Sequence, residues 1–115
     1  MLDSNRKKQL QTEYREREII GGVYLVKNTL KNKALLDAST DLQGSQNRFE
    51  FAQQTGSGVF PKLQEDWNTQ PSSSFEFEIL EQIKRNDGQT AAEFLADVNL
   101  LAEIWTEKLA DADLY

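Results

Sequence analysis

The amino-acid sequence predicts a small α+β domain: a three-stranded, mainly antiparallel sheet flanked by helices, with an added N-terminal helix. Three patterns carry this prediction. Residues 19–28 form a β-branched and aromatic run, residues 75–79 alternate between apolar and polar, and a helical apolar period follows Thr90. Three short strands cannot bury their apolar faces alone, so helices must pack on the sheet. We divide the 115 residues into a helical extension, residues 1–19, and one domain, residues 20–115.

The N-terminal segment has the composition of a solvated helix. Residues 3–18 are charged and rich in good helix formers, and Asp3 or Ser4 can cap the start of a helix. Leu10 and Tyr14 lie four positions apart and therefore share one side of that helix. Basic and acidic residues are interleaved along the segment. We expect a helix that contacts the rest of the chain along one narrow stripe.

The domain is expected to open with a β-hairpin. Strands at residues 22–28 and 33–37 are separated by a short polar turn, in which Asn32 can take the left-handed conformation. The later elements are expected as helices at residues 47–52 and 61–67, a strand at 74–80 and a helix at 90–109. Thr90 and Glu93 form the capping-box pattern that begins the last helix.

The expected core combines one face of the last strand with one face of the closing helix. Its members are Phe75, Phe77, Ile79, Phe94, Val98, Leu101 and Trp105. Trp67 either covers the sheet or stays exposed for a partner.

Composition excludes several kinds of chemistry. With no Cys and no His, the chain has no thiol nucleophile, disulfide, imidazole base or zinc-finger site. Carboxylate oxygens remain as metal ligands, and they suit Mg²⁺ or Ca²⁺. A net charge of −6 predicts weak or no general nucleic-acid binding, because phosphate neutralisation needs clustered Lys and Arg. We find no apolar run long enough to span a membrane and no signal-peptide pattern, so we expect no membrane association and a cytoplasmic protein.

Two tripeptides stand out in the predicted hairpin. Gly22-Val23-Tyr24 and Leu35-Leu36-Asp37 are separated by ten residues. They are followed by Asn47-Arg48-Phe49 and by the segments at residues 62–67, 75–80 and 103–109. In this order and spacing, the segments resemble the GIY-YIG nuclease family, most closely its small bacterial stand-alone domains. The two tripeptides stand where the family has GIY and YIG.

The resemblance implies a degenerate catalytic site. In the family, two tyrosines, an arginine and a metal-binding glutamate surround the scissile phosphate. Tyr24 matches the first tyrosine and Arg48 matches the arginine. The second tyrosine position is Leu35, the glycine that follows it is Asp37, and the glutamate position is Ala102. The site therefore lacks a phenol that activates water and the carboxylate that holds a cation.

These losses lead us to expect a catalytically inert domain that serves as a binding or interaction module, without a cofactor and with a protein as the candidate partner. Tyr24 would then be a packing residue, and Arg48 would be a solvated helix residue or would pair with Glu50 or Asp37. The alternative is a residual metal-dependent DNA endonuclease that uses Tyr24 and Arg48. In that alternative, Asp37, Glu50 or Glu103 would hold Mg²⁺ in place of the missing glutamate.

Overall fold

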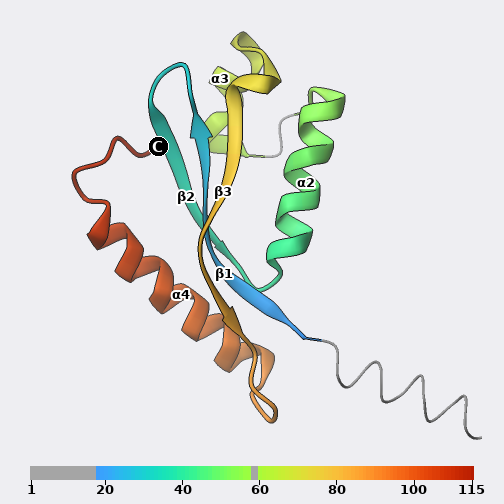
Figure 1. The fold of residues 1–115 in the computed structure, drawn as a ribbon, viewed down its shortest axis with the longest axis vertical. Coiled ribbons are helices and arrows are strands. Elements are labelled where there is room, and N and C mark those ends of the chain that lie inside the picture. Colours follow the sequence, from blue (N-terminus) through green and yellow to red (C-terminus); the bar gives the residue numbers. More distant parts are fainter. Residues whose placement is uncertain (1–17, 58–59) are drawn as a thin grey trace, which may run out of the picture.

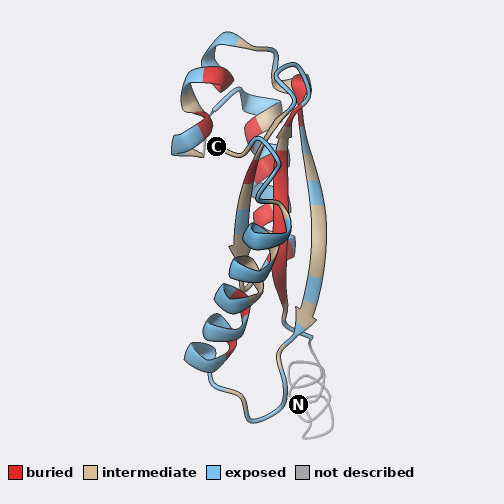
Figure 2. Ribbon diagram, turned by 90° about the vertical axis from the view of Figure 1, so that its left-hand side faces the viewer, coloured by how far each residue is buried: buried red, intermediate tan, exposed pale blue. Residues whose placement is uncertain are grey.

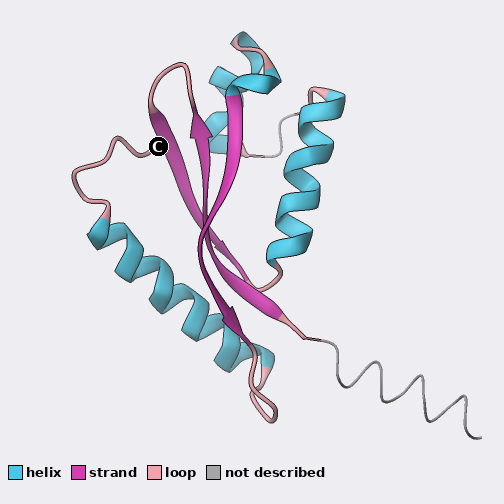
Figure 3. Ribbon diagram, in the orientation of Figure 1, coloured by secondary structure: helices cyan, strands magenta, loops and turns pink. Residues whose placement is uncertain are grey.

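The computed structural model describes residues 18–57 and 60–115, and it has the predicted α+β architecture (Figures 1 and 3). Its elements are β1 (Ile20–Asn28), β2 (Lys33–Ser39), α2 (Leu42–Thr55), a 3-10 turn (Pro61–Leu63), α3 (Gln64–Thr69), a second 3-10 turn (Ser72–Ser74), β3 (Phe75–Lys84) and α4 (Ala91–Lys108). The helix expected over residues 3–18 lies outside the described residues.

The three strands form an antiparallel sheet in the order β2-β1-β3, so β1 is central. Asn32, with φ of 52°, supplies the left-handed residue expected in the β1–β2 turn. The register places Tyr24 opposite Asp37 on one side and opposite Ile79 on the other. An irregularity between Val23 and Tyr24 shifts the pairing with β3. The hairpin prediction is confirmed.

Gly22 is required by the close approach of β1 and β3. A Cβ atom at this position would lie 2.0 Å from the carbonyl oxygen of Glu81, and the φ of 154° is one that L side chains rarely adopt. The glycine of the first tripeptide therefore serves strand pairing.

Helices cover both faces of the sheet, with α2 and α3 on one side and α4 on the other (Figure 1). Because side chains alternate along a strand, Tyr24 and Val26 face α2, whereas Val23 and Leu25 face the opposite way. A Cβ atom at Gly21 would lie 3.0 Å from the Phe94 ring of α4, which fixes α4 on this second face. Buried residues follow β1 through the middle of the domain (Figure 2).

Two elements extend at least four residues past a predicted end. The helix expected at residues 47–52 begins at Leu42, because the Asp41 carboxylate accepts a hydrogen bond from the Gly44 amide at 3.0 Å and caps the first turn. The strand expected at residues 74–80 continues to Lys84, because β1 provides pairing partners as far as Ile20. Both extensions consist mostly of polar residues, so no apolar pattern in the sequence predicted them.

The aromatic core also differs in part from the prediction. Trp67 is 5% exposed and stacks on Phe75 at 4.6 Å, so it covers the sheet. Phe77 and Trp105, expected in the core, are half-buried. Phe77 lies on an edge strand of the sheet. Trp105 directs its indole N–H to the Glu81 carboxylate at 2.8 Å, near the surface.

Across the described part of the chain, no helix combines the length and apolar character needed to cross a membrane.

Candidate functional site

The side chain of Tyr24 is the centre of the candidate site. It is 3% exposed, and its ring stacks on Phe77 with a centroid distance of 4.6 Å. Its hydroxyl donates a hydrogen bond to Oδ2 of Asp37 at 3.2 Å. The other carboxylate oxygen of Asp37 accepts from the Ala38 amide at 2.8 Å, which orients the carboxylate. The β1–β2 register brings these two residues together.

Helix α2 adds a second polar pair beside Tyr24. Ser45 is 2% exposed, and its hydroxyl oxygen accepts a hydrogen bond from the guanidinium of Arg48 at 3.2 Å. The two residues are three positions apart, so they share one side of α2. Within residues 18–57 and 60–115, Arg48 makes no ion pair with Glu50 or Asp37. The expectation of such a pair was wrong.

The surroundings of Tyr24 keep its hydroxyl protonated. Burial raises the pKa of Tyr24 to about 12, and the negative charge of Asp37 and the hydrogen bond to it act in the same direction. The Ser45 hydroxyl and the Arg48 charge lower this pKa, but by less. At neutral pH Tyr24 is therefore a hydrogen-bond donor directed at a carboxylate.

The other positions implied by the resemblance lie outside this cluster of Tyr24, Asp37, Ser45 and Arg48. Leu35 is 6% exposed and packs in the core beside Val26. Ala102 lies on α4, on the sheet face opposite α2 (Figure 1). Among the described residues, no three His, Cys, Asp or Glu side chains are grouped to hold a metal ion.

Ser45 was missed by the sequence analysis. Its signal was available: a small polar residue three positions before Arg48 lies on the same helical side. The contact between Tyr24 and Asp37 was also missed, because it depends on the strand register.

One of three comparisons with known proteins finds a similar structure. No family model matches the chain, and no curated protein matches it either. Among solved structures, the chain is similar to the catalytic domain of the intron endonuclease I-TevI, in a mutant form, with 26% sequence identity and a TM-score of 0.56. The match covers 80% of this chain and 86% of that one. The chain has a GIY-YIG-like fold. The resemblance inferred from the sequence is confirmed at this level.

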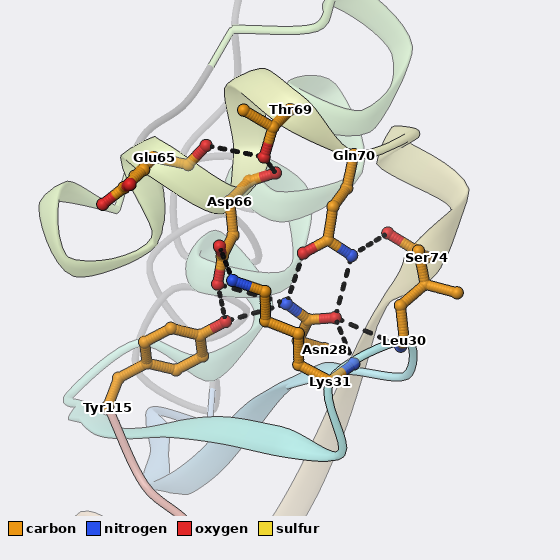
Figure 4. Close-up of polar contacts among 9 residues, drawn as sticks. All are labelled: Asn28, Leu30, Lys31, Glu65, Asp66, Thr69, Gln70, Ser74 and Tyr115. Atoms are coloured by element: carbon orange, nitrogen blue, oxygen red, sulfur yellow. Dashed lines mark hydrogen bonds and ion pairs between the residues drawn. The ribbon is translucent and has the colours of Figure 1, made fainter.

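A second polar cluster of the GIY-YIG-like domain surrounds Asn28, at the end of β1 (Figure 4). Asn28 is 1% exposed. Its amide nitrogen donates to Gln70 at 2.7 Å, to the Tyr115 hydroxyl at 2.8 Å and to Asp66 at 3.3 Å. Its amide oxygen accepts from the backbone of Leu30 and Lys31 at 3.1 and 3.2 Å and from Gln70 at 3.0 Å. One side chain thus joins the hairpin turn, α3 and Tyr115.

Asp66 is the charged member of this second cluster. It is 7% exposed and accepts hydrogen bonds from Lys31 and from the Tyr115 hydroxyl. These partners, Lys31 first, lower the pKa of Asp66, whereas burial and Asp66 raise the pKa of Tyr115. In the described residues, every buried side-chain nitrogen and oxygen has a hydrogen-bond partner. A closed network of this kind stabilises the fold.

Proposed function

We propose that this GIY-YIG-like domain is catalytically inert and serves as a binding module with a protein partner. The observation that carries the proposal is the hydrogen bond from the Tyr24 hydroxyl to Asp37. A tyrosine that assists phosphodiester cleavage must accept a proton or orient the attacking water. With a pKa of about 12, roughly one Tyr24 side chain in 10⁵ is deprotonated at pH 7. Its one proton is already directed to a carboxylate.

The neighbouring substitutions support the same proposal. Asp37 places a negative charge beside Tyr24, where an approaching phosphate would be repelled. Leu35 has no group that bonds or transfers a proton, and Ala102 has no oxygen that binds a cation. Each change removes transition-state stabilisation, and loss of the metal ligand alone costs on the order of 10³-fold in rate.

The charge of the domain favours a protein partner over nucleic acid. The chain has a net charge of −6, and residues 1–17 contribute five basic and three acidic side chains. Residues 18–115 therefore carry a net charge of −8. A net charge of this sign disfavours phosphate binding, which needs clustered cations.

A cleavage assay tests the proposal. The full chain is incubated with Mg²⁺ or Mn²⁺ and with supercoiled plasmid or branched DNA, beside Tyr24→Phe as the matched control. We expect no cutting above that control, because the hydroxyl plays no chemical part. Metal-dependent cutting that Tyr24→Phe abolishes would overturn the proposal.

One observation favours the alternative, a residual endonuclease. Tyr24, Ser45 and Arg48 lie in one cluster, and the similar solved structure is a catalytic domain. In this alternative Arg48 would stabilise phosphate charge, and Asp37 or Glu50 would bind Mg²⁺. Arg48→Ala discriminates between the two proposals: it should abolish cutting in the residual enzyme and change nothing in the inert module.

A further inference from the structure

Helix α4 leaves part of its apolar surface in contact with solvent (Figure 2). Leu100 and Ile104 are 57% and 40% exposed, whereas Phe94 and Val98 of the same helix are buried. Leu100 and Ile104 are four positions apart, so they lie on one side of α4, one turn from each other. Single exposed apolar residues are ordinary in a soluble protein, but neighbouring ones are typical of a surface that another molecule covers.

A groove lies beside this pair, between α4 and the end of β3. It has a volume of about 450 Å³ and follows two turns of α4. Its lining, which defines what we name the α4 groove, consists of Ile83, Lys84, Asn86, Asp97, Leu100, Leu101 and Ile104. Because Leu100 and Ile104 are so exposed, the α4 groove is open, and a small molecule in it would keep much of its surface in water. An amphipathic helix can instead lay its apolar face along such a groove.

The surroundings of the α4 groove are acidic. Residues 81–115 contain eight acidic and three basic side chains, a net charge of −5. Asp97 lines the groove. Glu93 lies four positions before Asp97, and Glu107 lies three positions after Ile104, so both share this side of α4. An apolar groove with such a rim favours a partner that is apolar on one face and cationic around it.

The three basic side chains of this region do not cancel its negative charge. Lys84 lines the groove, but its ammonium group forms an ion pair with Glu18 at 3.1 Å. The Nζ atom of Lys108 lies 4.6 Å from the centroid of the Trp105 ring, a cation–π contact at the surface of α4. The third, Arg85, lines a separate pocket beside the start of β1. The groove therefore stays attractive to cations.

We propose that the α4 groove binds a cationic amphipathic helix of a protein partner. Apolar side chains of that helix pack on Leu100, Ile104 and Ile83, and its lysines and arginines lie near Asp97 and Glu107. The proposal rests on the proposed function, because it names the class of partner for a protein-binding domain. A chain that cut DNA and still bound such a helix would refute the inert module and leave this proposal standing.

Fluorescence anisotropy with two labelled peptides tests the proposal on the full chain. Both peptides have the same numbers of leucines and lysines and about 16 residues, which form a helix of about 24 Å, close to the length of α4. In the first peptide the leucines recur every three and four residues, and in the second they alternate with lysines as in a strand. We expect the first peptide to bind at least about tenfold more tightly than the second, with an affinity that falls as salt is added.

Two pairs of substitutions locate the binding surface. Leu100→Ser with Ile104→Ser removes the exposed apolar pair and should weaken binding of the first peptide by about tenfold or more. Leu30→Ser with Phe51→Ser is the matched control, because these residues are 66% and 61% exposed and lie in the β1–β2 turn and on α2. The control variant should bind the first peptide as the natural chain does. All four positions are exposed, so neither variant is expected to disturb the fold.

Three results would overturn the proposal. The first is equal affinity for the two peptides, or an affinity that Leu100→Ser with Ile104→Ser leaves unchanged. The second is an equal loss in the control variant, which would show that the peptide binds the acidic domain without regard to the groove. The third is binding of neither peptide, which is expected if a second copy or another part of the same chain covers the groove.

Discussion

The hydroxyl of Tyr24 and the carboxylate of Asp37 lie 3.2 Å apart across the β1–β2 pair, joined by a hydrogen bond that the hydroxyl donates. The bond exists because antiparallel register places the two residues opposite each other. In a catalytic site, the same hydroxyl would need to accept a proton or orient the attacking water. In the inert module that we propose, Tyr24 is therefore a hydrogen-bond donor held by Asp37.

This relationship predicts a pH dependence of stability. Because the pKa of Tyr24 is raised to about 12 in the folded state, its contribution is complete below the ordinary tyrosine pKa of 10.0 and is lost as pH rises through 12. Tyr24→Phe keeps the ring on Phe77 but has no group to ionise. The free energy of unfolding should therefore fall more steeply between pH 10 and 12 in the natural chain than in Tyr24→Phe. Urea titrations of the two proteins at a series of pH values measure the free energy of unfolding. An identical change with pH in both proteins would contradict a raised pKa of Tyr24 in the folded state.

The Asn28 cluster should matter for stability. Asn28→Ala removes one side chain of a buried network and leaves partners such as Asp66 and Gln70 incompletely paired. We expect a loss of about 2–4 kcal/mol in the free energy of unfolding. The control Asn68→Ala removes an exposed side chain that accepts one bond from Gln64, and should cost less than about 0.5 kcal/mol. If urea denaturation gave the two variants the same loss in free energy of unfolding, the Asn28 network would not stabilise the fold.

The core assignment predicts a contrast between two aromatic residues. Trp67 is 5% exposed and stacked on Phe75, whereas Phe51 is 61% exposed on α2. Trp67→Ala should lower the free energy of unfolding by about 3–5 kcal/mol. Phe51→Ala should change it by less than about 0.5 kcal/mol. Chemical denaturation midpoints decide the matter, and an unchanged midpoint in Trp67→Ala would refute the packing of α3 on the sheet.

The charge of the chain predicts weak binding to random duplex DNA. With a net charge of −6, we expect a Kd no tighter than about 10⁻⁵ M at physiological salt. Fluorescence anisotropy with a labelled duplex measures it. Tight binding that weakens steeply with added salt would show instead that the basic residues of the N-terminal segment are free to contact phosphates.

Much of the fold was readable from local chemistry. The hairpin followed from a polar turn with Asn32 in its left-handed conformation, and the start of α4 followed from the Thr90 and Glu93 capping box. Both features depend on residues close in sequence. The extension of β3 to Lys84 was not readable, because its pairing partners lie far away in β1.

The candidate site was predicted less completely for the same reason. Tyr24, Arg48 and Asp37 were identified by position along the chain. Their contacts depend on strand register and on which side of α2 faces the sheet, and these bring Ser45 between Arg48 and Tyr24. The sequence also did not predict that Trp105 and Phe77 are half-buried. The spacing of apolar residues shows which face of an element is apolar, but it does not show how deeply that face is covered.

The ionisation of Tyr24 reports whether its hydroxyl is held as a hydrogen-bond donor to Asp37. The chain has three tyrosines, so ¹³Cζ labelling gives three resonances, and Tyr24→Phe assigns one of them. We predict that Tyr24 titrates near pH 12, and that Asp37→Asn, which removes the charge but keeps the shape, lowers its pKa. A Tyr24 pKa at or below the ordinary value of 10.0, unchanged by Asp37→Asn, would contradict the inert-module proposal, because the hydroxyl would then be free to take part in chemistry.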